Sequence, residues 1–443
     1  MKVADGLREA LQHGDGFGEL YADDARLDAS VLGARRRATG PHQIAAILTE
    51  LFPGPGRLVE WAAKEHPAGV AAWLERVHGE GQAVRQRHYL HVQDRRIARH
   101  WIYAAPPRTG AGDGRPAFPL AQLPERSAEV VGHEVMASTG WSGSRIERLR
   151  LADGRALIAK RVVPGVDWLG RATGDPGREG LMFATGTFDR MPPDIDHAIV
   201  SAHREDGAWW VLMRDVSAEL LPDGVRLSRA DNRRVLRSLN DMWETFWGQR
   251  PEGLASQRDR IGAVAPRISE IERAGLDLLP KQFEAAWEAF AAAVEPDVAD
   301  PVLKLVDEPA PLCAALDRHG TTLLHGDVRD EQLGLTGDRL VLLDWGIATQ
   351  GHPAIEYAWY LMHCGWRIDA THDELWEDFR AARAERDDPE AIQLGFLSGL
   401  VMYGWILGHS AVVHPDPHER AWATAELDWW VPRARGTLER ASL

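Results

Sequence analysis

Hydrophobic residues at the start of the chain follow first a helical and then an alternating spacing. Val3, Leu7 and Leu11 recur every four residues, and a second helical pattern begins after Pro41. Runs that are typical of strands come next. The runs read LVEWAA, GVAAWLERV, AVRQRHYLHV and RIARHWIYA. The pattern predicts two helices followed by a meander of antiparallel strands, which together form a small α+β domain with a curved sheet over residues 1–108.

The stretch 104–124 divides the chain. It is rich in Pro, Gly and Ala and has no sustained periodicity, so it is typical of a linker, whose bounds we place at 109–124. Strand-like runs follow it, and helical patterns dominate from Ser228 onward. The first predicted strands cover residues 130–136, 146–151 and 156–163. This order predicts a strand-rich small lobe over 125–217 joined to a helical large lobe over 218–443.

The charge of the chain narrows the range of partners. It has 51 Lys and Arg against 66 Asp and Glu, which gives a formal net charge of −15. Such an acidic balance disfavours nucleic acid or an anionic membrane as the main partner, and it suits a cationic small molecule. Cys313 and Cys364 are the only cysteines, so neither a disulfide framework nor a cysteine-based zinc site is expected. The first residues carry charges throughout, so we expect no signal peptide and a cytoplasmic protein.

One apolar stretch is long enough to raise the question of a membrane. Residues 391–415 contain no Asp, Glu, Lys or Arg. Gln393 and Ser398 interrupt the stretch, however, and glycines recur along it. A helix that is apolar all round also suits the core of a large helical lobe, and we predict a buried helix here.

The segment 323–346 carries the pattern with the most specific chemistry. It reads LLHGDVRDEQLGLTGDRLVLLDWG, in which Asp327 follows His325 and Gly326, and Asp344 ends an apolar hairpin. Phosphoryl transfer needs a carboxylate that accepts the proton of the attacking hydroxyl and oxygen ligands that hold magnesium. The hairpin would place the two carboxylates on the same side of a cleft. The alternative is that both aspartates only form turns or caps.

The same segment resembles the catalytic and metal-binding loops of the aminoglycoside phosphotransferase and choline kinase-like family. The resemblance implies a bilobal, protein-kinase-like fold, with ATP or another nucleoside triphosphate and Mg²⁺ as cofactors. It makes Asp327 the catalytic base and Asp344 a magnesium ligand, and it gives His325 a supporting role in the loop. Residues 351–356 resemble a further segment of the family that is structural.

One position departs from the family pattern. The family has Asn five residues after the catalytic Asp as its second metal ligand, and this chain has Gln332 there. Glutamine keeps the amide oxygen that magnesium accepts but adds a methylene. Asp330 or Glu331 are alternative ligands. This departure motivates a second hypothesis, a nucleotide-binding or regulatory protein that has lost turnover.

The small lobe offers a cation and an acidic partner for the phosphates. Lys160 lies in the strand-like run ALIAKRVV, where a lone cation among apolar residues needs a compensating charge. Arg178-Glu179 matches a pair that the family has in the next helix. By that resemblance Lys160 would hold the α- and β-phosphates and Glu179 would fix its side chain. The alternative is an edge-strand lysine that points to water.

Two further nucleotide contacts rest on weaker patterns. The segment STGWSGS, with Ser138, Gly140, Ser142 and Gly143, could let backbone amides approach phosphate, although a plain hairpin turn has the same composition. The segment VLMRDVS resembles the family's hinge between lobes, which would place the backbone of Met213 and Asp215 at the adenine.

The phosphate acceptor would be a hydroxylated small molecule, such as an amino sugar, an antibiotic or a related metabolite. Nine acidic residues between 369 and 390 would suit a cationic acceptor. Arginines alternate with them, however, and the favoured interpretation is the solvated face of an exposed helix.

Residues 1–108 resemble the cone-shaped fold shared by SnoaL-type polyketide cyclases, ketosteroid isomerase and nuclear transport factor. The candidate pocket residues are Tyr21, Asp28, His88 and Trp101. This resemblance motivates a third hypothesis, cyclase- or isomerase-like chemistry in the N-terminal pocket. The alternatives are that this domain binds a ligand or forms a homodimer. The expected architecture is thus α+β, with an N-terminal cone-shaped barrel followed by a bilobal kinase-like domain.

Overall fold

The structure is a computed structural model that describes residues 2–31, 33–78, 82–106, 117–124, 128–136, 144–222, 224–386 and 388–440. The chain forms two compact units. Unit 1 consists of Met1–Arg108, Val264–Asp307 and Tyr403–Arg435, and unit 2 consists of Thr109–Ala263, Glu308–Met402 and Gly436–Leu443. The two later segments of unit 1 fall in the range that we assigned to the large lobe. Both units combine helices and strands, which confirms the mixed α+β class.

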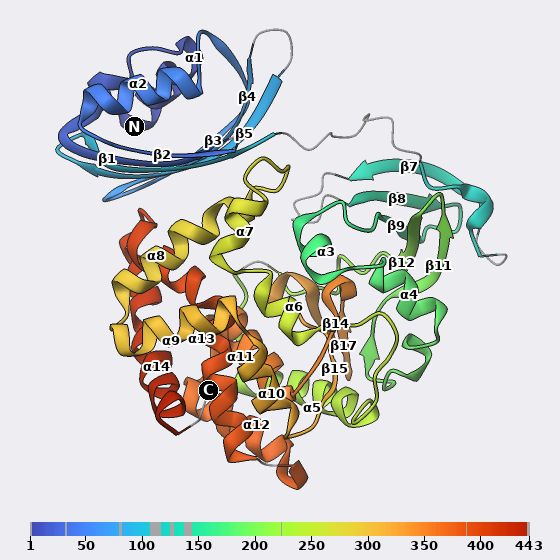
Figure 1. Cartoon of the computed structure of the whole chain (residues 1–443). Coiled ribbons are helices and arrows are strands. Elements are labelled where there is room, and N and C mark those ends of the chain that lie inside the picture. The colour runs from blue at the N-terminus through green and yellow to red at the C-terminus, as the bar shows by residue number, and fades with distance from the viewer. Residues whose placement is uncertain are drawn as a thin grey trace. The chain divides into compact units, whose positions relative to one another are not determined.

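Unit 1 begins with a six-stranded sheet in the order β2-β1-β6-β5-β4-β3. Neighbouring strands are antiparallel except for β1 and β6, which are parallel. The strands are β1 (Tyr21–Val31), β2 (Ala34–Thr39), β3 (Gly56–His66), β4 (Gly69–His78), β5 (Gln82–Gln93) and β6 (Arg96–Ala105). Two helices, α1 (Lys2–His13) and α2 (Pro41–Leu51), cover one face of this sheet (Figure 1). The finer prediction of a SnoaL-like cone stays a prediction.

The other face of the sheet packs on helices from the later segments of unit 1. Because side chains alternate along a strand, Leu90 faces α1 and α2 while its neighbour Tyr89 faces the opposite side. Tyr89 shares a hydrophobic cluster with Ala285 and Ala289 of α8 and with Val413. The helices of these segments are α7 (Pro266–Ile271), α8 (Phe283–Ala293), α9 (Pro296–Asp307), the end of α13 (Pro389–Val413) and most of α14 (Pro417–Arg440).

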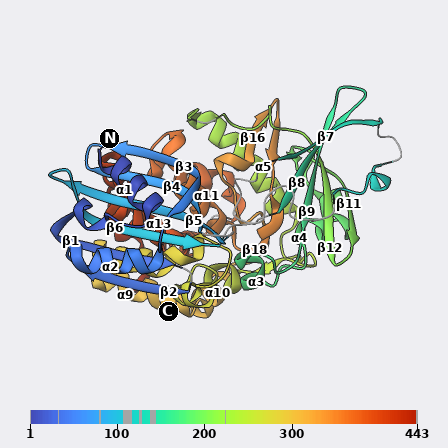
Figure 2. The same cartoon turned by 90° about the horizontal axis from the view of Figure 1, so that it is seen from above.

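Unit 2 contains a five-stranded antiparallel sheet in the order β11-β12-β9-β8-β7 (Figure 2). Its strands are β7 (Val130–Met136), β8 (Arg145–Leu151), β9 (Ala156–Val162), β11 (Ile199–Glu205) and β12 (Ala208–Arg214). The helices of this unit are α3 (Trp168–Thr173), α4 (Arg178–Ala184), α5 (Arg229–Thr245), α6 (Gln257–Gly262), α10 (Ala310–Asp317), α11 (Pro353–Cys364), α12 (His372–Ala382) and the start of α13. Its short strands are β10 (Ile195–Asp196), β13 (Leu227–Ser228), β14 (Ala255–Ser256), β15 (Thr322–Leu324), β16 (Leu333–Thr336), β17 (Arg339–Leu342), β18 (Thr349–Gly351) and β19 (Ile368–Asp369).

The apolar stretch forms α13, the one helix among the described residues that is long and apolar enough to cross a membrane. In its most apolar window, 89% of the residues are buried inside the protein. Glycine lets a neighbouring helix approach closely, since a Cβ atom on Gly408 would lie 2.4 Å from the Cα atom of Phe290 in α8. These contacts are those of a core helix, as the sequence predicts.

Candidate active site

Short strands hold the carboxylates of the candidate site. The loop with Asp327 follows β15 directly, and β16 pairs with β17 in an antiparallel hairpin. Leu333 at the start of β16 lies opposite Leu342 at the end of β17. Gln332 and Asp344 therefore lie at the same open end of the hairpin. Leu333 of β16 and the apolar residues of β17 are buried, which fixes this register.

The ammonium group of Lys160 lies between two carboxylates. Its Nζ is 2.7 Å from Oε2 of Glu179 in α4 and 2.7 Å from Oδ1 of Asp344. Lys160 and Glu179 expose only 10% and 1% of their side chains, whereas Asp344 exposes 44%. Lys160 is therefore not an edge-strand lysine in water, because β9 lies inside the sheet and the side chain is paired. Asp344 is the member of this cluster that remains accessible to a ligand.

Gln332 joins Asp344 to Asp327. Its side-chain Nε2 donates to Oδ2 of Asp327 at 3.0 Å and lies 3.4 Å from Oδ2 of Asp344. Its Oε1 is buried and has no hydrogen-bond partner among the described residues. Rotation of the amide would turn this oxygen toward the two carboxylates. Two carboxylates and an amide oxygen are a donor set that suits Mg²⁺, so these residues fit the metal that the sequence implies.

The loop after β17 is fixed by hydrogen bonds to α4. The backbone N–H of Trp345 donates to Oε1 of Glu179 at 3.0 Å. Arg178 donates through Nη1 to the carbonyl oxygen of Gly346 and through Nε to that of Gly253, the latter at 2.8 Å. These contacts hold Asp344 in a left-handed backbone conformation with φ 65°, which non-glycine residues rarely adopt.

Buried side chains support the loop that carries Asp327. His325 is fully buried and has Nε2 3.0 Å from the carbonyl oxygen of Leu343, while its Nδ1 accepts from the N–H of Asp327 at 3.2 Å. Burial lowers the pKa of His325 to about 4, so the ring is neutral at pH 7. Glu356 accepts from the N–H of Gly326 at 2.7 Å and from Trp243 Nε1 at 2.9 Å. His325 thus supports the loop rather than taking part in proton transfer.

The charges of the cluster determine its protonation. Burial lowers the pKa of Lys160, but the charges of Asp344 and Glu179 outweigh this effect and leave that pKa above its ordinary value. Desolvation raises the pKa of Asp344, yet the ammonium of Lys160 brings the net pKa below the usual range. Burial raises the pKa of Glu179, and the nearby ammonium offsets only part of this rise. Lys160 and Asp344 are therefore charged at neutral pH.

The structure describes only some of the remaining predicted nucleotide contacts. Ser138, Gly140, Ser142 and Gly143 fall within 137–143, outside the described residues. Met213 lies in β12 and shares a hydrophobic cluster with Leu343, the residue before Asp344.

Asp215 directly follows β12. Its N–H donates to the carbonyl oxygen of Ala156 at 3.1 Å, and its carboxylate pairs with Arg148 at 2.9 Å. The adenine contacts of Met213 and Asp215 stay predictions.

Two contributors to the site escaped the sequence analysis. Arg329 lies with its Nε 3.2 Å from Oδ2 of Asp327 and neutralises part of that carboxylate's charge. Arg329 lies two residues after Asp327 in a loop of acidic residues, and this position could have indicated that it pairs with one of them. Glu356 was assigned to a structural segment, but its direct bond to Gly326 was not foreseen. A contact across thirty positions between a helix and a loop has no local sequence pattern.

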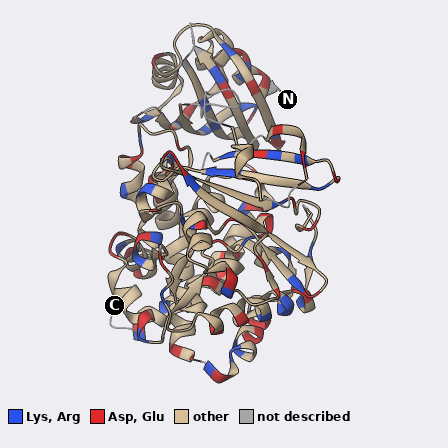
Figure 3. Cartoon of the chain, turned by 90° about the vertical axis from the view of Figure 1, so that its right-hand side faces the viewer, with Lys and Arg blue, Asp and Glu red and all other residues tan. Residues whose placement is uncertain are grey.

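The acidic segment 369–390 is largely paired within the protein. Asp378 binds Arg229 at 2.8 Å and Arg233 at 3.0 Å, and Asp388 lies 2.6 Å from His319. Acidic and basic positions are interspersed along helices and strands (Figure 3). These ion pairs leave less acidic surface for a cationic acceptor than the composition suggests, as the favoured interpretation expects.

Two of the N-terminal candidates, Tyr21 and His88, belong to a buried chain of hydrogen bonds on the face under α1 and α2. Tyr21 Oη lies 2.6 Å from Nδ1 of His100, whose Nε2 lies 2.8 Å from Nδ1 of His88. His88 Nε2 in turn lies 2.8 Å from Oε1 of Gln86. Each of these four side chains is buried, with 2% or less of the residue exposed.

Asp28 and Trp101 lie on the opposite face of the same sheet. They are register partners in β1 and β6, and Asp28 binds Arg35 through Oδ1 at 2.8 Å. Since His100 and Trp101 are neighbours in a strand, their side chains point to opposite faces. The four candidates of the third hypothesis are therefore divided between two faces and do not converge on one pocket.

Comparisons with known proteins were made on sequence and on structure. No model of a known protein family matches the chain, and no curated protein matches it either. Among solved structures, an aminoglycoside phosphotransferase from Alicyclobacillus acidocaldarius is 15% identical and covers 75% of this chain and 97% of its own, with a TM-score of 0.42. The GDP complex of aminoglycoside 2'-phosphotransferase-IIIa is 15% identical over 72% of this chain and 97% of its own, with a TM-score of 0.39. A choline kinase from Streptococcus pneumoniae is 11% identical over 70% and 93%, with a TM-score of 0.38.

Proposed function

We propose that the chain is a phosphotransferase that moves the γ-phosphoryl group of ATP to a hydroxyl group of a small molecule. One observation carries the proposal. Lys160, Glu179, Asp344, Gln332 and Asp327 come from four separate segments and form a single connected cluster of charged and polar side chains. Phosphoryl transfer requires a cation for the phosphates, oxygen ligands for a metal and a carboxylate for the attacking hydroxyl, and this cluster contains all three.

Each side chain has a role that follows from its contacts. Asp327, held by Gln332 and Arg329, would orient the acceptor's hydroxyl group and accept its proton. Lys160 would hold the α- and β-phosphates while the buried Glu179 fixes its side chain. Asp344 and Gln332 would hold Mg²⁺ through their oxygens. The bound Mg-ATP supplies the phosphoryl group and the positive charge that neutralises its oxygens.

The acceptor is proposed to be a hydroxylated small molecule, with amino sugars and related antibiotics as the first compounds to examine. Incubation of the protein with Mg-ATP and a panel of such compounds, read by mass spectrometry, should reveal an adduct of one phosphoryl group. The adduct should be lost in Asp327→Asn. Formation of the adduct by that variant at the wild-type rate would exclude this role for the cluster.

A second candidate function is nucleotide binding without turnover. It is favoured by Gln332, whose amide N–H groups, and not its oxygen, face both carboxylates. The two candidates differ in their need for metal. A thermal shift with ATP that is as large in EDTA as in Mg²⁺, together with no transfer to any acceptor, would support the second candidate over the first.

A further inference from the structure

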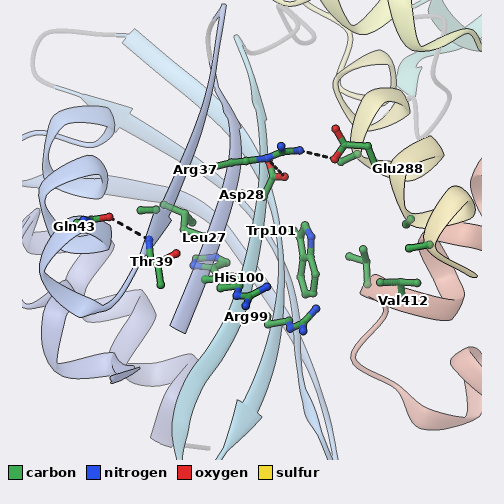
Figure 4. A pocket seen from close by; sticks show the side chains of 16 residues that line it. Leu27, Asp28, Arg37, Thr39, Gln43, Arg99, His100, Trp101, Glu288 and Val412 are labelled. Carbon is green, nitrogen blue, oxygen red and sulfur yellow. Dashed lines mark hydrogen bonds and ion pairs between the residues drawn. The ribbon is translucent and has the colours of Figure 1, made fainter. Parts of the chain in front are cut away.

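Unit 1 contains a cavity of about 600 Å³, a size within the range that small organic ligands occupy. Its walls come from β1, β2 and β6 of the N-terminal sheet, the first turns of α2, one side of α8 and the end of α13 (Figure 4). All of these segments belong to the same compact unit. Of the pocket residues that the sequence predicted, Asp28 and Trp101 line this cavity, whereas Tyr21 and His88 belong to the buried hydrogen-bonded chain on the other face.

Two arginines stand side by side at this cavity. Arg26 in β1 and Arg99 in β6 are register partners on adjacent parallel strands, so their side chains leave the sheet on the same face. Both line the cavity, and neither has a hydrogen bond or ion pair with any of the described residues. Both arginines are exposed to solvent, and like charges placed opposite each other on neighbouring strands repel one another. The pair is thus a cationic position without an internal counter-charge.

The acidic residues of the cavity do not supply that charge. Asp28 accepts from Arg35 at 2.8 Å and from Arg37 at 3.0 Å. Glu288 in α8 is bound by the same two arginines, with Arg35 at 2.9 Å (Figure 4). Two carboxylates are therefore matched by two other arginines. Arg26 and Arg99 are therefore the arginines of the cavity wall that pair with no carboxylate among the described residues.

Much of the remaining wall is apolar, and Trp101 contributes a large flat ring to it. Trp101 lies two residues after Arg99 on the same face of β6 and is half-buried. It packs in one cluster with Ala285 and Ala289 of α8 and with Val412 of α13. Figure 4 shows Arg99 and Trp101 projecting from the sheet toward the side on which Val412 lies. An indole next to small aliphatic side chains is a surface on which a planar apolar group can stack.

We propose that this cavity binds a small organic anion that carries a carboxylate on a flat, apolar ring system. The carboxylate would take charge-assisted hydrogen bonds from Arg26 and Arg99, and the ring would lie against Trp101. This site is distinct from the candidate active site, which lies in unit 2, and its test needs no turnover.

The test uses naphthoate and its uncharged counterpart naphthamide, which share one ring system and differ in charge. Isothermal titration calorimetry of the full chain should show naphthoate binding about tenfold more tightly than naphthamide, the ratio that one charge-assisted hydrogen bond provides. Equal affinities for the two probes, or no binding of naphthoate, would overturn the proposal.

Single substitutions test whether the probes bind at this cavity. Arg99→Ala should weaken naphthoate about tenfold and leave naphthamide unchanged, whereas Trp101→Leu should weaken both probes. Arg96→Ala is the matched control, because Arg96 lies in the same strand, is 57% exposed and does not line the cavity. The proposal fails if Arg96→Ala weakens naphthoate as much as Arg99→Ala does. Circular dichroism and the unfolding temperature establish that each variant is folded.

Discussion

The chain contains two connected clusters of polar side chains that differ in almost every property relevant to chemistry. The cluster around Lys160 in unit 2 is charged, and Asp344 exposes 44% of its side chain. The chain of hydrogen bonds from Tyr21 to Gln86 in unit 1 is neutral, and His88 is completely buried. Burial lowers the pKa of His88 to about 3, so that it stays uncharged over the physiological range.

This contrast separates a cluster that is accessible to a ligand from a network of buried, neutral side chains. In the first cluster, Gln332 and Asp344 retain oxygen atoms that a ligand can use. In the second, Tyr21, His100 and His88 bind one another and are almost completely buried. Resemblance to catalytic families drew attention to both regions. Only the charge and accessibility of the side chains separate them.

The largest expected effect is on the rate. Asp327→Asn removes the proton acceptor and should lower the rate of phosphoryl transfer by about 10²–10⁴-fold, the usual contribution of a general base. Nucleotide affinity, measured by calorimetry, should change little because Asn keeps the size of the side chain. Asp338→Asn is the control, since Asp338 is exposed and lies at the turn between β16 and β17, away from the cluster. If both variants lost the same rate, Asp327 would have no special role. The charged cluster would then not differ from the neutral one in reactivity.

A large effect on stability is expected at Lys160. Lys160→Met leaves the buried carboxylate of Glu179 without its cation, and the free energy of unfolding should fall by about 3 kcal/mol. Urea unfolding followed by tryptophan fluorescence measures this change. The same substitution at the exposed Lys304 should cost less than about 0.5 kcal/mol. Similar losses of stability for the two substitutions would show that the ion pair between Lys160 and Glu179 does not stabilise the charged cluster.

The neutral cluster should affect stability without affecting transfer. Tyr21→Phe removes a buried hydroxyl group and leaves Nδ1 of His100 without its partner at 2.6 Å, so unfolding should become easier by about 1–2 kcal/mol. The rate of transfer should stay unchanged. Tyr89→Phe is the control, because its hydroxyl has only a 3.5 Å contact with Arg87. A large loss of activity in Tyr21→Phe would instead assign chemistry to the N-terminal domain.

The smallest expected effect is a dependence on pH. The folded pKa of His88 is about 3, below the unfolded value of about 6.5. The unfolded chain therefore binds a proton that the folded chain does not, and stability that is complete above pH 6.5 is lost as the pH falls toward 3. Between pH 6 and 5, His88→Gln should reduce this loss by about 1 kcal/mol, as measured by urea unfolding. Identical slopes for both proteins would contradict the neutral character of the cluster.

Local patterns predicted the elements well, because alternating and helical spacing reflect burial on one side of each element. The hairpin between Gln332 and Asp344 is an example, since its apolar strands and central glycine are read within a few residues. Lys160 was expected near a carboxylate because a cation among apolar residues needs one. In the structure Lys160, Gln332 and Asp344 lie in one cluster, which also contains Glu179 and Asp327.

Contacts between distant segments were not predictable in this way. Nothing in the local pattern of residues 283–293 indicates that Ala285 and Ala289 pack on a sheet formed by the first 105 residues. The division of the N-terminal candidates was missed for a different reason. Adjacent residues such as His100 and Trp101 point to opposite faces, and grouping by proximity in sequence ignores that alternation.

Unit 1 consists of three separate segments of the chain, so its parts are synthesised at different times. The N-terminal sheet leaves the ribosome well before Val264–Asp307 and Tyr403–Arg435 are made. Until then the aromatic face with Tyr89 and Tyr103 lacks the helices that bury it in the finished protein. A nascent chain with an uncovered apolar face is prone to misassembly, so this interval is where a chaperone would act. Unit 1 is complete only when Arg435 has left the ribosome.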